Sequence, residues 1–150
     1  MPTEEQIRER YPIWNALSEF FLDDELSYED HLRIASVLTE SRYTEEQIYD
    51  ILRHEVYPAC SLNLVSGAGA WGTWGEDWIR ERIAPRYDRR PRFYLPAFNW
   101  GGIRRHWQVV LSMVSKSRSE QQEGEQDGGG YALEPTSHPA TARPKARATP

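Results

Sequence analysis

Three glycines in the stretch GAGAWGTWGEDW, at positions 67, 69 and 72, have the spacing of a dinucleotide-binding loop. In a G-x-G-x-x-G loop, backbone N–H groups and a helix N-terminus bind the pyrophosphate, so a buried strand must precede the glycines. The chain before Gly67 has helical patterns instead, and Trp71 and Trp74 are bulky where a pyrophosphate needs close approach to the backbone. We therefore expect no nucleotide here, and we expect the glycines to form turns that fold the tryptophans onto the core.

Side chains with catalytic potential are sparse. His54 and Glu55 begin like a zinc-protease motif, but Pro58 stands where the second histidine is required. Cys60 with His54 is a conceivable nucleophile and base, although a single cysteine behind a helix is usually a small buried hydrophobe. The chain also has no P-loop, no G-x-S-x-G motif and no calcium-loop spacing. These observations predict no catalytic residues, no metal site and no cofactor.

Acidic residues dominate the first half of the chain. Residues 1–77 hold 16 Asp and Glu against 5 Lys and Arg, a balance of -11, whereas residues 78–118 have a balance of +8. The densest acids are Asp23, Asp24 and Glu25, near a predicted helix C-terminus, where the helix dipole disfavours negative charge. We take them, with Trp74, as a partner-binding site. The alternative is that arginines such as Arg80 and Arg82 neutralise this corner within the fold.

Residues 89–108, RRPRFYLPAFNWGGIRRHWQ, interleave five arginines with five aromatic residues. This mixture suits stacking on single-stranded nucleic acid. It equally suits packing of arginines on aromatic rings against an acidic helical domain. The overall acidity of the chain favours packing, so nucleic-acid binding is kept as an alternative function.

Helical periodicity and capping residues predict the elements that position these groups. Pro12 is disfavoured inside a helix but tolerated in a first turn, which predicts a lead-in turn followed by a helix over about 12–22. Ser27 is a good N-cap for a second helix, and Thr44 opens a capping box for a third. Pro58 is expected to end the third helix.

The second half of the chain has fewer helical signals. A Gly/Trp-rich loop is expected after Cys60, and then a helix that begins at Glu76 or Asp77 and stops at Pro85. Residues 85–102 are expected to connect to an amphipathic helix from Ile103. Beyond residue 117 there is almost nothing to bury, which predicts a disordered tail over 118–150.

Composition indicates the setting of the protein. A single cysteine excludes an intramolecular disulfide and is typical of a reducing compartment. The N-terminus has no apolar run of the kind that a signal peptide needs, and no window approaches 18 consecutive apolar residues. We therefore expect a cytoplasmic protein without membrane contact.

Three motifs, PxWxALS from Pro12, FLDxEL from Phe21 and ILxxEVxPxC from Ile51, resemble a small bacterial family known only as a domain of unknown function. The resemblance covers about residues 10–83, and the segment from Pro85 onward lies outside it. It implies a compact helical domain with no established activity, so no catalytic residues carry over. Matching residues that we expect to be structural are Trp14, Cys60, Asn63, Trp71 and Trp78.

Together these features predict a mainly α fold, a compact bundle of about five helices with a Gly/Trp-rich loop and a disordered C-terminal tail. Residues 1–117 form the domain, with a family-like part at about 10–83 and a basic aromatic extension at 85–117. The predicted function is non-enzymatic protein binding, with toxin neutralisation as one form of it. The alternative is an enzyme whose acids and histidines, such as His54, Glu55 and Asp23, are brought together only by the fold.

Overall fold

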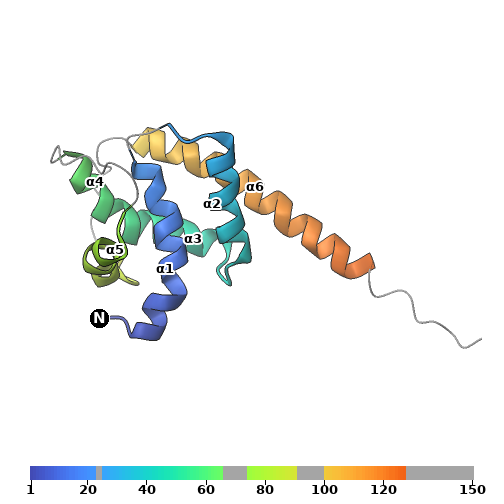
Figure 1. Cartoon of the computed structure of the whole chain (residues 1–150). Coiled ribbons are helices and arrows are strands. Elements are labelled where there is room, and N and C mark those ends of the chain that lie inside the picture. Colours follow the sequence, from blue (N-terminus) through green and yellow to red (C-terminus); the bar gives the residue numbers. More distant parts are fainter. Residues whose placement is uncertain (23–24, 66–73, 91–99, 128–150) are drawn as a thin grey trace, which may run out of the picture.

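A computed structural model describes residues 1–22, 25–65, 74–90 and 100–127 (Figure 1). Every regular element in these ranges is helical, which confirms the predicted mainly α fold. The elements are α1 (Glu4–Ser18), η1 (Glu19–Phe21), α2 (Tyr28–Glu40), α3 (Glu45–Ile51), η2 (Leu52–Val56), α4 (Tyr57–Val65), α5 (Glu76–Arg82), η3 (Ala84–Arg86) and α6 (Trp100–Asp127). The short elements η1 and η3 are 3₁₀ turns, and η2 is a π-helical turn.

Helix α1 contains Pro12 in its interior, so the predicted helix start at residue 12 is wrong. The helix begins instead at the capping box of Thr3 and Gln6. Proline removes one backbone hydrogen bond. Buried residues on both sides of it, such as Ile7 and Trp14, pack into one core, and burial of each large apolar side chain stabilises by about 1.5–3 kcal/mol. Burial therefore outweighs the cost of the proline.

Helices α2 and α3 begin at the capping boxes of Ser27 and Thr44, as predicted. The predicted end at Pro58 is wrong, because the chain stays helical through η2 into α4 and reaches Val65. In η2 the N–H of Tyr57 donates to the carbonyl of Leu52, five residues back. This π-helical turn ends just before Pro58, so the proline lies in the first turn of α4. Its lack of a backbone N–H is tolerated there, because the N–H groups of a first helical turn have no partner within the helix. Residues 61–65, which were predicted to belong to the loop, are therefore helical, and residues 66–73 with their glycines lie outside the described ranges.

Helix α5 begins at Glu76, as predicted. Helix α6 starts at Trp100, before the predicted Ile103, and continues to Asp127, so the predicted disorder is wrong for residues 118–127. Arg118 explains the added order, because its Nη2 donates to the carbonyls of Leu38 and Tyr43, each at 2.9 Å. A helix already begun in the core also extends at low cost per residue. Residues 128–150 lie outside the described ranges.

One core joins these helices. Helix α2 packs along the first part of α6, and the rest of α6 projects from the body of the protein (Figure 1). Helix α1 packs against α2, η2 and α5. Fully buried core residues come from every part of this arrangement, namely Ile13, Trp14, Leu17, Ile34, Leu38, Ile48, Leu52, Val56, Ile79, Ile83, Ile103 and Val110. None of the helices in the described ranges combines the length and hydrophobicity that crossing a membrane requires.

Candidate functional site

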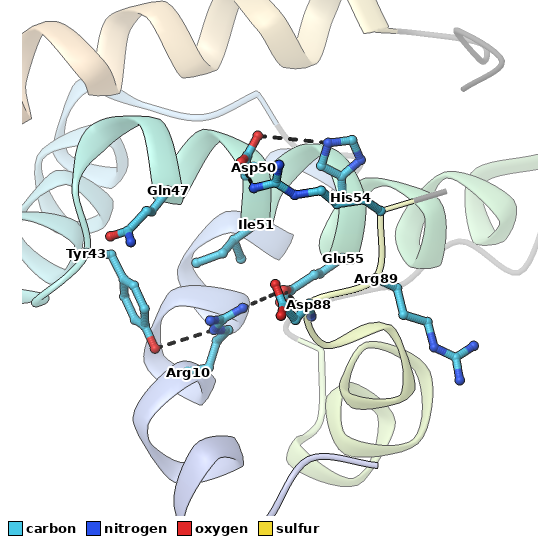
Figure 2. Close-up of a pocket in the computed structure, with 10 residues that line it drawn as sticks. Arg10, Tyr43, Gln47, Asp50, Ile51, His54, Glu55, Asp88 and Arg89 are labelled. Carbon is cyan, nitrogen blue, oxygen red and sulfur yellow. Dashed lines mark hydrogen bonds and ion pairs between the residues drawn. The ribbon is translucent and has the colours of Figure 1, made fainter. Parts of the chain in front are cut away.

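A polar pocket of about 130 Å³ opens where α1, α3, η2 and the turn after η3 meet (Figure 2). The π-helical turn η2 supplies His54 and Glu55 to it. Single π turns within helices are frequent at functional sites. Its lining residues are Arg10, Tyr43, Gln47, Asp50, Ile51, His54, Glu55, Asp88, Arg89 and Arg90.

Glu55 is the centre of a buried hydrogen-bond network at the base of this pocket. Its Oε1 accepts from Arg10 Nη1 at 2.5 Å and from the backbone N–H of Asp88 at 2.9 Å. Its Oε2 accepts from Trp14 Nε1 at 2.7 Å. The glutamate is 3% exposed, and burial raises its pKa, although the three hydrogen bonds favour the charged form. One carboxylate therefore joins α1, η2 and the 83–90 segment.

Arg10 is held from several directions. Its Nε donates to Tyr43 Oη at 3.4 Å, and its guanidinium lies 4.9 Å from the ring centre of Tyr43 and 4.2 Å from that of Tyr87. Asp88, whose backbone also bonds Glu55, has a positive φ of 53°, a conformation that aspartate tolerates better than most residues. These contacts fix the arginine and the turn relative to each other.

The mouth of the pocket carries one further ion pair and a histidine near the same carboxylate. Arg90 Nη2 lies 2.9 Å from Asp50 Oδ2, and His54 Nε2 lies 3.9 Å from Asp50 Oδ1. Burial lowers the pKa of His54 below its ordinary value, in spite of Asp50. The fold thus brings His54 and Glu55 to one pocket, while Asp23, the third residue of the enzyme alternative, lies outside the described ranges.

Cys60 is fully buried, and this burial raises the pKa of its thiol well above the ordinary range. Because the thiolate is the reactive form, such a thiol is inert. Among the described side chains, no group of three or more His, Cys, Asp and Glu is arranged to hold a metal ion. Cys60 does not line the polar pocket.

The structure describes two of the four predicted partner-binding residues, Glu25 and Trp74. Glu25 is exposed, whereas Asp23 and Asp24 lie outside the described ranges. Trp74 is 6% exposed and its Nε1 donates to the carbonyl of Ser18 at 2.9 Å, so its predicted place on a binding surface is wrong. The indole N–H of Trp74 is therefore used within the fold and not by a partner.

The described contacts of the arginines expected to neutralise the acidic corner are with other acids. Arg80 pairs with Glu4 of α1 at 2.9 Å and with Glu76 of α5 at 3.0 Å. Arg82 is exposed and forms no ion pair with a described side chain. Because Asp23 and Asp24 lie outside the described ranges, neutralisation of the acidic corner by arginines stays a prediction.

The residues expected to be structural include several core positions. Trp14 and Cys60 are fully buried, and the half-buried Trp78 stacks on Trp74 with ring centres 4.1 Å apart. Asn63 is part of α4, but its side chain is not among the described ones. Trp71 lies wholly outside the described ranges.

A second surface, which we call the α2–α6 groove, lies between these two helices. Its cavity of about 240 Å³ is lined by Leu32, Ala35, Ser36, Thr39, Glu40, Met113, Ser117 and Gln121. Tyr28 is 68% exposed, Leu32 43% and Val109 38%. Tyr28 and Leu32 are one turn apart on α2, and Val109 and Met113 are one turn apart on α6, so each helix carries an apolar pair along its length.

Sequence reasoning missed a histidine pair between the same helices. His31 Nε2 lies 2.9 Å from His106 Nδ1, and His106 stacks on Phe20 with ring centres 5.8 Å apart. Burial first, and then His31 and Arg105, lower the pKa of His106, while Glu25 opposes them. Residues 75 positions apart leave no local sequence signal of their contact.

Comparison with known proteins identifies a family for most of the chain. Residues 8–117 match the family model described as a domain of unknown function, DUF7079. The match confirms the resemblance and extends it beyond residue 83, so the basic aromatic extension belongs to the family domain. Neither a curated protein nor a solved structure shows significant similarity to the chain.

Proposed function

The chain belongs to the DUF7079 family, a domain of unknown function, and we propose that it is a non-enzymatic module that binds another protein through the α2–α6 groove. The observation that carries this proposal is the position of the exposed large apolar side chains. Apart from Met1, those in the described ranges are Tyr28, Leu32 and Val109. Leu32 lines the groove, Tyr28 lies one helical turn before it on α2, and Val109 lies one turn before the lining residue Met113 on α6. Contiguous exposed apolar surface with a polar rim is typical of protein-binding sites.

The charge on the α2 side of the groove favours a partner with basic residues. Exposed Glu25, Glu29 and Glu40 lie before or along α2, and none of them forms an ion pair with a described side chain. An acidic rim accelerates encounter with a basic partner, and salt weakens this effect. An amphipathic helix with a basic flank would place its apolar face in such a groove.

A binding role agrees with the chemistry of the polar pocket. Its volume of about 130 Å³ is below the roughly 300 Å³ at which small-molecule sites begin. The buried Cys60 lacks the thiolate character that a nucleophile needs. These features support a non-enzymatic function.

Neutralisation of a toxin is the specific form of protein binding that we propose. An acidic surface with an apolar centre suits the inhibition of a basic enzyme, because it both attracts the enzyme and covers it. Co-expression with the captured partner tests this role. Growth inhibition by the partner that the chain relieves supports it, and a partner without toxicity contradicts it.

The groove is tested by capture and by affinity measurement. The tagged chain is used to isolate a partner from cells that express it, and the purified partner is then titrated by calorimetry. Leu32→Asp and Val109→Asp should each weaken binding at least about tenfold, because a charge would enter an apolar contact. Gln108→Asp is the matched control, since Gln108 is also exposed on α6 but lies toward α3. Equal affinity of all three variants would exclude the groove as the binding surface.

A further inference from the structure

We propose that the pair of His31 and His106 is a pH-sensitive switch of the α2–α6 groove. The pair holds α2 against α6 while its two rings share a hydrogen bond, and it releases α2 when both rings are protonated. The effect on a partner rests on the binding role proposed for the groove, whereas the switch itself depends only on the two histidines and the helices that carry them.

The two imidazole rings meet head to head. His31 Nε2 lies 2.9 Å from His106 Nδ1, within the range of protein hydrogen bonds. The ring centres are 5.2 Å apart, which is close to this length plus the distance from each nitrogen to its own ring centre. The two nitrogens therefore point at each other, and the contact is a direct hydrogen bond.

This hydrogen bond needs one proton between the two facing nitrogens. One neutral ring donates through its facing nitrogen, and the other ring accepts. A first added proton can bind the outer nitrogen of the donor ring, so the hydrogen bond survives. A second proton must occupy the accepting nitrogen, because the outer nitrogen of that ring already carries a hydrogen. Double protonation therefore replaces the hydrogen bond with two N–H groups that face each other on two charged rings.

Burial opposes the doubly charged state. His31 is 8% exposed, and the ring of Phe20 stacks on His106 with ring centres 5.8 Å apart. Burying a charge costs free energy unless the charge is paired. A doubly protonated pair therefore gains free energy when α2 and α6 separate and water reaches the rings.

The charged groups around the pair supply no direct counter-ion. Burial, and then His31 and Arg105, lower the pKa of His106, whereas Glu25, which precedes α2, raises it. On η1, Glu19 accepts two hydrogen bonds from Arg33. No carboxylate of the described residues forms an ion pair or a hydrogen bond with either ring. We therefore expect the second protonation, and with it the release of α2, below the ordinary histidine pKa of about 6.5.

The groove begins next to the pair. Helix α2 packs along the first part of α6 (Figure 1), and the pair joins the two helices near their first turns. Leu32, which lines the groove on α2, directly follows His31, and Met113, which lines it on α6, lies two turns after His106. A separation of the helices at the pair would therefore change the width of the groove.

Arg118 fastens the other end of the same contact. Its Nη2 donates to the carbonyls of Leu38 and Tyr43, each at 2.9 Å. Arginine stays charged in proteins, so acid does not release this end. Loss of the histidine hydrogen bond should therefore separate α2 from α6 at the His31 end and leave the Arg118 end in place.

The switch is tested first without a partner. In the ¹⁵N-labelled full chain at pH 7, nuclear magnetic resonance should detect a scalar coupling between His31 Nε2 and His106 Nδ1, which requires a direct N–H···N hydrogen bond. On acidification to pH 5 the coupling should disappear, and the methyl signals of Leu32 and Met113 should shift with the same midpoint. Absence of the coupling at pH 7 would refute the switch, and so would its loss without a shift of the two methyl signals.

Partner affinity tests the consequence for binding. The unchanged chain should bind the captured partner at least about tenfold more weakly at pH 5 than at pH 7, as measured by calorimetry. His106→Gln and His31→Gln each remove one of the two titrating rings, so both variants should lose most of this pH dependence. Circular dichroism at both pH values checks that the variants remain helical.

His54→Gln is the matched control, because His54 lines the polar pocket and not the groove. This variant should keep the pH dependence of the unchanged chain, and the partner's own titration is common to all the proteins compared. Equal pH dependence of His106→Gln, His31→Gln and His54→Gln would refute the switch while leaving the groove as a binding surface. If no partner binds the groove, the coupling and the methyl signals still decide whether the pair acts as a switch.

Discussion

Glu55 should be the most sensitive polar residue of the fold. Glu55→Ala removes the counter-charge of Arg10, which lies 2.5 Å away in a pair with side chains 11% and 4% exposed. It also removes the acceptor of the Trp14 indole and of the Asp88 backbone N–H. The variant is therefore expected to leave one buried charge and two donors without their partners.

The expected loss of stability follows from these contacts. Breaking a buried ion pair by removing one partner costs about 3–5 kcal/mol. Each orphaned donor adds about 1–3 kcal/mol when it stays dry, but water entering from the open pocket reduces both terms. We expect Glu55→Ala to lower the free energy of unfolding by about 4 kcal/mol, a large share of the roughly 5–15 kcal/mol that stabilises a typical domain.

Urea unfolding followed by tryptophan fluorescence and by far-ultraviolet circular dichroism measures this loss. Glu9→Ala is the matched control, since Glu9 pairs with Arg42 at 2.6 Å but the two side chains are 35% and 66% exposed. An exposed pair contributes about 0–1 kcal/mol. Glu55→Gln keeps the shape and an acceptor oxygen and should fall between the two. A Glu55→Ala loss no larger than that of Glu9→Ala would refute the reasoning.

Two further predictions concern the helices. Pro12→Ala should raise the free energy of unfolding by about 1–3 kcal/mol, because the proline is exposed and interrupts α1; an unchanged melting temperature would contradict this. His106 has a lowered pKa, chiefly from burial, so the folded protein favours its neutral form and loses stability as the pH falls below about 6.5, the ordinary histidine pKa. His106→Gln should make the decline in stability between pH 7 and pH 5 shallower than in the unchanged chain. Burial lowers the pKa of His54 as well, so a residual slope is expected, and equal slopes would exclude His106 as its source.

The sequence by itself determined where several helices begin. Ser27 and Thr44 each bond a residue three positions later, so the whole capping interaction lies within one short segment. The apolar stripes of α2 and α6 are also local periodicities, and their members Ile34, Leu38 and Val110 are fully buried. Capping interactions and apolar periodicities involve residues three or four positions apart, so they can be predicted from the sequence without knowledge of the fold.

Local rules failed where burial opposed them. Because proline lacks a donor, Pro12 predicted the start of a helix and Pro58 the end of one. The core contacts of Ile13, Trp14 and Val56, all at most 1% exposed, come from segments distant in the chain and are invisible to a local rule. The π-helical turn η2 has no capping signal in the sequence either.

The polar pocket is decided by the tertiary structure alone. Glu55 meets Trp14 across 41 positions and Arg10 across 45, so its residue type reveals neither its burial nor its partners. Tryptophan is a residue type that is often found in binding surfaces. Trp74 is nevertheless buried, and its Nε1 donates to the carbonyl of Ser18, a residue 56 positions away in the chain. Long-range contacts of this kind arise because the chain must satisfy every buried donor and acceptor at once. That requirement acts on the folded molecule as a whole, and it is the reason the site could not be read from spacing in the sequence.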